Sequence, residues 1–315
     1  MGEASEVTNG IVDRPHRGAD DFWPIRDFLS SLWPISPPGV PWDVRRWDGS
    51  YCHSDPPGLD EDRAARTRVW EADGGRIVAA ALSEGGRQLH PHVHPRYRWL
   101  LDDVVAWSER AAASAGSEEV LLHVWDHDAG MERLAERRGY RPTGGWEILR
   151  GLRFDTGPLP EPVVAGGYVM RATRDDEADH RAIAELLNAA FGRSFHHAGE
   201  LRNFQALAPS FRRDLDLVAF APDGSFAAYA AVCWDSANAH GIFEPVCTHP
   251  EHRRLGLAKA LMLEGMRRAR AMGAEVIDVG TGDMDPANAL YASLPFTEVY
   301  RGCFWEKRVG DGPSA

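Results

Sequence analysis

The sequence predicts a mixed α/β protein made of two tandem copies of one domain, each a mixed, mostly antiparallel sheet flanked by helices. Three observations lead to this prediction. A chain of 315 residues suffices for about two domains of ordinary size. In the second half, apolar residues follow strand and helix periods in the order β-α-β-β-β-α-β-α-β. Similar turns and strands occur 155 residues earlier in the chain.

Short signals define the elements of the second half in chain order. Apolar residues recur at helical spacing between 183 and 190, after the first expected strand. Pro222-Asp223-Gly224 is typical of a turn that closes a hairpin, and Gly273 ends a long helix that follows His249-Pro250. We therefore expect strands over 168–171, 215–221, 226–234, 242–248, 276–280 and 296–305, and helices over 179–191, from His249-Pro250 to Gly273, and over 286–294.

The first half repeats this order. Val93-His94-Pro95 corresponds to Thr248-His249-Pro250, and Leu121–Val124 corresponds to Val276–Val279 at the same offset. Asp73-Gly74-Gly75 occupies the position of the hairpin turn. Matched turns and strands in one order indicate duplication of a single domain.

A stretch rich in proline and glycine separates the two halves. Residues 153–167 contain three prolines and three glycines and have no sustained apolar period, which is typical of a linker. We therefore expect one domain over 1–152, a linker over 153–167 and a second domain over 168–315.

The composition indicates a folded protein and excludes several functional classes. Asp and Glu number 47 against 35 Lys and Arg, which argues against a nucleic-acid partner because phosphate contacts need a basic face. No apolar run approaches the roughly 18 residues of a membrane span, and no secretory signal is evident. Four widely spaced cysteines fit a reducing compartment. We expect a cytoplasmic protein that binds neither nucleic acid nor membrane.

The segment Arg253–Lys259 has the features of a phosphate-binding helix start. A strand leads through His249-Pro250 into a helix whose first residues combine two arginines with a glycine and an alanine. The first backbone N–H groups of a helix are unpaired and lie at the positive end of its dipole, so they suit a phosphate group. The alternative is a helix that begins with basic residues for no functional reason.

Two motifs in the second half resemble those of the GNAT superfamily of acyl-CoA N-acyltransferases. Arg253–Ala258 matches the family's Arg/Gln-x-x-Gly-x-Gly/Ala motif at the expected place between a strand and a helix. Asn288 and Tyr291, followed by Pro295-Phe296, are similar to its Asn-x-x-x-Tyr-x-x-x-Gly-Phe signature, with Pro295 in place of glycine. The tandem layout is similar to that of mycothiol synthase-like two-domain acetyltransferases.

The resemblance implies an acetyl-CoA site in the second domain. In this family the pyrophosphate rests on amides of the motif loop, and the pantetheine arm lies beside the preceding strand. The implied cofactor-binding residues are Val246, Cys247, Thr248, Arg253, Arg254, Leu255, Gly256, Leu257, Ala258, Lys259 and Asn288.

The resemblance also implies that Tyr291 donates a proton to the departing thiolate, whereas from the residues alone it would read as a core aromatic. Glu244, a carboxylate in an apolar strand, is the candidate base for the amine proton. It is displaced by two residues from the usual position of the family's glutamate, filled here by Ile242. The alternatives are a substrate contact or a salt-bridged strand residue.

Other polar residues favour structural roles. His249 matches His94 of the first half, which indicates a turn residue, and Cys247 reads as a buried strand residue. His90, His92 and His94 share one face of an expected strand, but no carboxylate at fixed spacing accompanies them, so we expect no metal site.

The first domain is predicted to be a degenerate copy. The offset of 155 places Leu101 and Asp103 where the second domain has Gly256 and Ala258, and the later offset, larger by one residue, places Ala135 where it has Tyr291. We therefore expect one active site per chain, which acetylates a primary amine of a small molecule by direct attack. The alternatives are a protein or peptide N-acetyltransferase and a non-catalytic acyl-CoA sensor. The sequence specifies neither the acceptor nor the oligomeric state.

Overall fold

The computed structural model describes residues 10–54, 56–155 and 157–309, which form two compact units. Unit 1 contains residues 10–43, 58–148 and 300–309, and unit 2 contains residues 44–57 and 149–299. Within the described ranges, no helix is long and apolar enough to cross a bilayer.

Unit 1 is a mixed sheet with helices packed against it. Its strands follow the order β1-β2-β3-β4-β5-β12-β6, in which β1–β2, β2–β3, β3–β4 and β5–β12 are antiparallel and β4–β5 is parallel. Its elements are β1 (Val12–Pro15), α1 (Phe22–Leu32), α3 (Glu61–Ala65), β2 (Arg68–Ala72), β3 (Arg76–Glu84), β4 (Gln88–Val93), α4 (Leu101–Ser114), β5 (Glu119–Trp125), α5 (Ala129–Arg137), most of β6 (Arg141–Arg153) and most of β12 (Glu298–Arg308).

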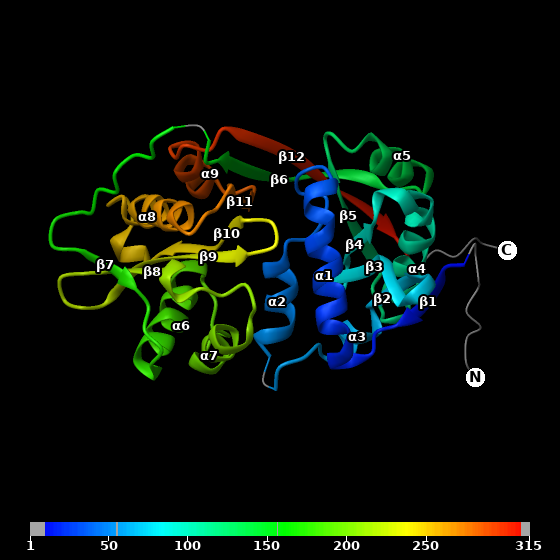
Figure 1. Cartoon of the computed structure of the whole chain (residues 1–315), viewed down its shortest axis with the longest axis horizontal. Coiled ribbons are helices and arrows are strands. Elements are labelled where there is room, and N and C mark those ends of the chain that lie inside the picture. The colour runs from blue at the N-terminus through cyan, green and yellow to red at the C-terminus, as the bar shows by residue number, and fades with distance from the viewer. Residues whose placement is uncertain (1–9, 55, 156, 310–315) are drawn as a thin grey trace. The chain divides into compact units, whose positions relative to one another are not determined.

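Unit 2 repeats this plan, with strand order β6-β11-β10-β9-β8-β7 and a parallel pair β10 and β11. Helix α8 covers one face of its sheet, and α6 and α7 cover the other (Figure 1). Its elements are α2 (Val44–Cys52), β7 (Val169–Ala172), α6 (Glu177–Phe191), α7 (Ala198–Leu207), β8 (Asp216–Phe220), β9 (Phe226–Asp235), β10 (His240–Thr248), α8 (Leu257–Ala271), β11 (Val276–Gly282) and α9 (Asp285–Ala292).

The predicted fold class and the order of strands and helices in the second half are confirmed, with boundaries shifted by a few residues. Gly273 follows α8 with a left-handed φ of 94°, as expected for a glycine that ends a helix. One helix was missed. Helix α7 has only Leu201, Phe204 and Gln205 buried, so its apolar pattern is short.

The compact units divide the chain differently from the predicted domains. The last strand of the second half, expected over 296–305, lies in unit 1 as β12 and pairs antiparallel with β5. Residues 149–153 of β6 lie in unit 2 instead. Alternation of apolar residues indicates that a segment forms a strand, but the choice of partner strand depends on tertiary packing. The sequence alone therefore could not predict that β12 pairs in unit 1 or that the end of β6 lies in unit 2.

Helix α2 comes from the first half of the sequence but also belongs to unit 2. The Asp48 carboxylate is fully buried and accepts a hydrogen bond from the Ser210 N–H at 3.0 Å. Asn203 of α7 donates to the Ser54 carbonyl at 3.0 Å. These bonds anchor the segment 44–57, because a buried carboxylate without its donor costs free energy.

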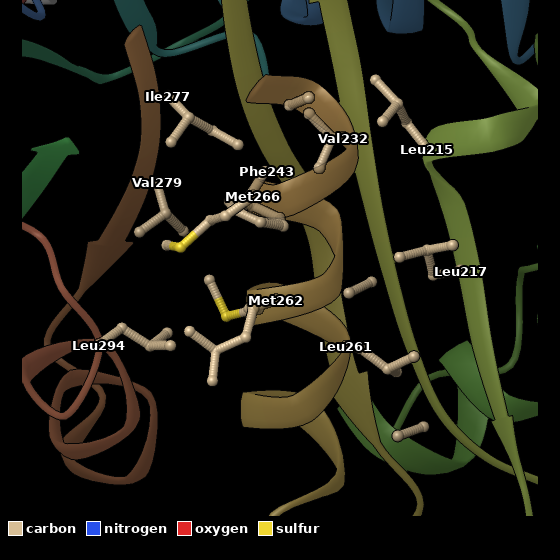
Figure 2. Packing of buried hydrophobic residues seen from close by; sticks show 14 of the residues in the cluster. Leu215, Leu217, Val232, Phe243, Leu261, Met262, Met266, Ile277, Val279 and Leu294 are labelled. Atoms are coloured by element: carbon tan, nitrogen blue, oxygen red, sulfur yellow. The ribbon is translucent and has the colours of Figure 1, made fainter. Parts of the chain in front are cut away.

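The core of unit 2 forms between α8 and the sheet. Met262 and Met266 of α8 lie beside Val279 and Phe243 of the strands (Figure 2). Gly265 lets α8 approach closely, since a Cβ there would lie 3.1 Å from the Phe243 ring. The linker predicted over 153–167 contributes to this core as well, through Phe154, Leu159 and Ala165.

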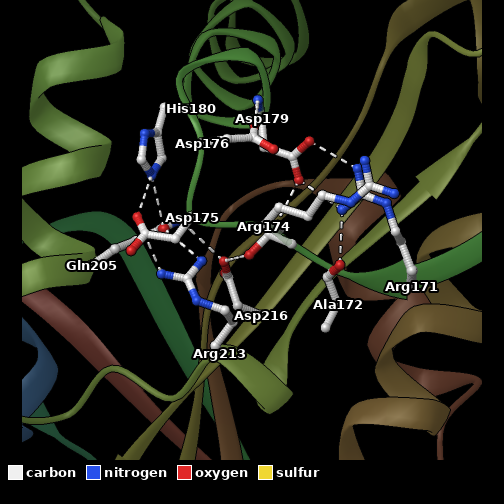
Figure 3. A network of polar contacts seen from close by, with 11 residues as sticks. Arg171, Ala172, Arg174, Asp175, Asp176, Asp179, His180, Gln205, Arg213 and Asp216 are labelled. Carbon is white, nitrogen blue, oxygen red and sulfur yellow. Dashed lines mark hydrogen bonds and ion pairs between the residues drawn. The ribbon is translucent and has the colours of Figure 1, made fainter.

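A buried carboxylate organises the polar network at the base of α6 and α7 (Figure 3). Asp216 accepts hydrogen bonds from the Tyr229 hydroxyl at 2.5 Å, from the Gln205 amide at 3.2 Å and from the Thr173 hydroxyl. Burial raises the pKa of Asp216 to about 6, although these hydrogen bonds act in the opposite direction. The group therefore binds its proton more tightly in the folded chain than in the unfolded one.

The raised pKa of Asp216 predicts that its contribution to the free energy of unfolding depends on pH. Because the folded pKa is raised, the stabilisation from protonated Asp216 is complete below the unfolded pKa and is lost as the pH rises towards 6. The unfolding free energy of the natural chain, minus that of Asp216→Asn, should fall by about 2 kcal/mol between pH 4 and pH 7. Urea denaturation at each pH measures it. A difference that stays constant with pH would contradict the assignment.

Candidate active site

A β-bulge interrupts strand β10. Phe243 and Val246 both pair with β9, and two residues, Glu244 and Pro245, fall between them where β9 has only one. Phe243 and Val246 both pack on the α8 side of the sheet. The bulge therefore directs the Glu244 side chain to the opposite face, where α2 and α7 lie.

The same strand separates from β11. Their parallel pairing covers only 240–242 of β10 and 276–278 of β11, although the strands continue to Thr248 and Gly282. Beyond Ile242 the β11-facing edge of β10 has no strand partner in this pairing. An extended ligand can lie along such an edge and bind its backbone groups. Pro245 has no N–H, so Val246 and Cys247 are the nearest potential donors.

The start of α8 presents backbone N–H groups to solvent. Arg254 and Gly256 both adopt left-handed conformations, with φ of 68° and 74°, and α8 begins at Leu257. Alternating left-handed residues before a helix form a concave set of N–H groups that binds anions. Arg253 instead donates to the Ala190 carbonyl at 3.1 Å. Among the described residues, no side-chain hydrogen bond of this kind holds Arg254 away from a ligand.

Gly256 is required by its backbone rather than by crowding. A Cβ at this position would meet no atom within 4 Å, but its φ of 74° is strained for any side chain. A substitution here therefore alters the loop mainly through conformation and through the group that it adds.

Tyr291 of α9 is buried at 6% exposure within the core cluster of unit 2. Burial raises its pKa to about 12, with further upward contributions from Cys247 and Glu244 and an opposing one from Arg150. The structure thus brings Tyr291 within electrostatic reach of Glu244, and its hydroxyl holds a proton at neutral pH. Its burial is compatible both with a role in core packing and with a role as a proton donor.

Asn288 is engaged by the protein itself. Its amide nitrogen donates to the carbonyls of Gly282 at 2.9 Å and Met284 at 3.1 Å, and its oxygen accepts from Arg150 at 3.0 Å. Arg150 is buried, and burial lowers its pKa. These contacts tie the end of β11 and the end of β6 to α9, the helix that carries Tyr291.

Glu244 is a partly exposed polar group of β10. Its side chain is 42% exposed and lies 3.7 Å from the guanidinium of Arg45. Cys247 is buried, and burial raises the pKa of its thiol to about 12, so it remains a protonated strand residue. His249 accepts from the Glu251 N–H at 3.3 Å, which confirms its turn role.

The corresponding part of unit 1 has a different geometry. A 3-10 helix, Pro95–Leu100, leads directly into α4, and no described residue between them has a positive φ. Leu101 and Ala135 are buried in the core of this unit, whereas Asp103 is exposed in the first turn of α4. In the described part of the chain, no group of side chains could hold a metal ion, and His90 and His92 stack near Trp42 instead.

Two residues of the site were missed from the sequence. Arg45 and Arg150 are single arginines without a motif, and both come from the part of the chain assigned to the first domain. Only the packing of 44–57 and 149–153 into unit 2 brings them to the site.

Comparison with known proteins identifies the region that contains these features. Residues 180–296 match the model of the acetyltransferase (GNAT) family. No match was found among curated proteins. The family match supports an acyltransferase enzyme.

Solved structures share the fold over nearly the whole chain. A GCN5-related N-acetyltransferase from Sphaerobacter thermophilus is 20% identical, with a TM-score of 0.64 over 98% of this chain and 99% of that one. A tandem GNAT protein from the clavulanic acid biosynthesis pathway is 18% identical, with a TM-score of 0.65 over 96% and 99%. A GNAT-family acetyltransferase from Colwellia psychrerythraea is 12% identical, with a TM-score of 0.59 over 94% and 99%.

The contacts of Asn288 predict a stability effect. Asn288→Ala should lower the free energy of unfolding by about 2 kcal/mol, because it removes the acceptor of Arg150 and the side-chain hydrogen bonds to two carbonyls, which keep their backbone donors. Ser293→Ala, which removes one exposed hydrogen bond at the end of the same helix, should change it by less than about 1 kcal/mol. Chemical denaturation compares the variants. Equal effects would show that the Asn288 amide contributes no more than a surface bond.

Proposed function

We propose, from the GNAT domain that residues 180–296 form, that this protein transfers an acetyl group from acetyl-CoA to a primary amine of a small molecule. The observation that carries the proposal is the open edge of β10. It runs from the Glu244 bulge towards the anion-binding start of α8, with Tyr291 close to Glu244. Acetyl-CoA is the usual co-substrate of the family.

The chain's own groups assign a place to each part of acetyl-CoA. The backbone N–H groups of Arg254–Lys259 bind the pyrophosphate, with the Arg254 guanidinium adding charge. The pantetheine arm lies along Val246–Thr248, where β11 no longer pairs. An N–H of Val246 or Cys247 polarises the thioester carbonyl and stabilises the oxyanion of the tetrahedral intermediate.

The reaction is a direct attack of the amine on the thioester. A neutral amine forms the C–N bond, and Glu244 accepts the proton that the amine loses and passes it to solvent. The C–S bond then breaks, and Tyr291 gives its proton to the departing thiolate and regains one from solvent. The products are an N-acetylated amine and CoA.

Gly256→Glu tests the binding of CoA. The added carboxylate lies at the pyrophosphate position, so CoA binding should fall at least about 100-fold through like-charge repulsion. Gly224→Glu is the matched control, because Gly224 is also left-handed and open but lies in the β8–β9 turn. Calorimetry should give one CoA per chain for the natural protein and the control. A stoichiometry near two, or unchanged affinity in folded Gly256→Glu, would refute this assignment.

Tyr291→Phe tests the leaving-group acid. Without the hydroxyl, turnover should fall by roughly 100-fold while CoA affinity changes little. Tyr140→Phe removes another buried hydroxyl, in unit 1, and should leave turnover near that of the natural chain. The measurement is release of free CoA with a panel of amines. Normal turnover in Tyr291→Phe would leave this residue with a packing role only.

A further inference from the structure

Arg45 faces the open part of the site from α2. Its Nη1 lies 3.7 Å from Oε1 of Glu244, and its guanidinium lies over the Phe204 ring at 5.1 Å. The Arg45 side chain is only 13% exposed, whereas that of Glu244 is 42% exposed. The Arg45 cation and the Glu244 anion thus lie side by side at the bulge, and Glu244 is the more exposed of the two.

The groups around this pair carry further negative charge. Glu200 of α7 is 13% exposed and lies 3.0 Å from His196 and 3.5 Å from His53. His53 stacks on the Phe204 ring, which Arg45 also contacts, with ring centroids 4.6 Å apart. Burial and the neighbouring Arg45 lower the pKa of His53 to about 3, so its ring is neutral in ordinary buffers. Arg45 therefore lies beside the Glu244 carboxylate and near a neutral imidazole.

We propose that the acceptor is a zwitterion, an amino acid or a compound with the same pairing of charges, whose carboxylate binds Arg45 while its amine lies at Glu244. The proposal rests on the proposed function and names the substrate class of that site. Segment 44–57 thereby supplies the specificity-determining residue of unit 2.

The energetic argument starts from the ion pair itself. At 3.7 Å, partly exposed, the pair contributes little and opens readily. An amine that takes Glu244 as its counter-ion draws this carboxylate away from the largely buried guanidinium of Arg45. A carboxylate on the same ligand restores the partner, and the planar guanidinium can bind it through two parallel hydrogen bonds.

The negative charge near Arg45 also limits which anionic group the acceptor can carry. A phosphate monoester carries close to two negative charges at neutral pH, and it would meet Glu244 as well as Arg45. A carboxylate carries one charge, which its own ammonium group balances. The site therefore favours a carboxylate over a phosphate on the acceptor.

Matched acceptor pairs test this inference. Lysine and cadaverine, histidine and histamine, and tyrosine and tyramine differ only in the carboxylate. Calorimetry on the CoA-loaded protein should show at least about 10-fold tighter binding of the amino acid in a pair that binds, the value of one charged hydrogen bond. CoA release should show the same preference in kcat/KM.

Arg45→Met should reduce that preference to near unity, because it should weaken the binding of the amino acid but not of the amine. Arg202→Met is the matched control, because Arg202 lies on α7 but pairs with Glu177; it should keep the preference. If no amino acid binds better than its amine, the inference is overturned even where amines are acetylated. If the Arg45-dependent preference in binding appears without CoA release, the inference holds and the proposed acetyl transfer fails.

Discussion

The interruption of pairing along β10 is the constraint on which the site depends. A strand between two fully paired neighbours would present no backbone groups and would alternate its side chains regularly. The bulge at Glu244 turns a carboxylate towards α2 and α7 while Phe243 and Val246 stay on the α8 side. The loss of β11 after Ile242 exposes the edge that follows. Strand β10 thus contributes residues to the core, leaves one edge unpaired with β11 and carries a partly exposed carboxylate.

The sequence predicted those parts of the molecule whose signals are local. Gly256 and its arginines mark the helix start, and the structure places left-handed residues there. The strands and helices of unit 2 follow from apolar periods, except α7, whose buried residues are few. Glu244 could be placed on a strand, but the bulge that orients it depends on how β9 and β10 pair, and this information is not local.

The parts that could not be predicted depend on contacts between distant segments. β12 pairs with β5 and the end of β6 lies in unit 2, although each strand has an ordinary alternating pattern. The Asn288 amide joins three segments around α9, which its motif alone does not indicate. A motif identifies a residue type and a spacing, whereas the partners of a side chain are decided by packing.

The first half of the chain supplies residues to unit 2. In unit 1 a 3-10 segment that is interrupted at Tyr97 leads into α4 where unit 2 has the left-handed loop, and no described residue of 95–101 has a positive φ. Yet Arg150, which bonds Asn288, and Arg45, which faces Glu244, both precede residue 153 in the chain and lie in unit 2. Removal of the first half would therefore remove two charged groups of the remaining site.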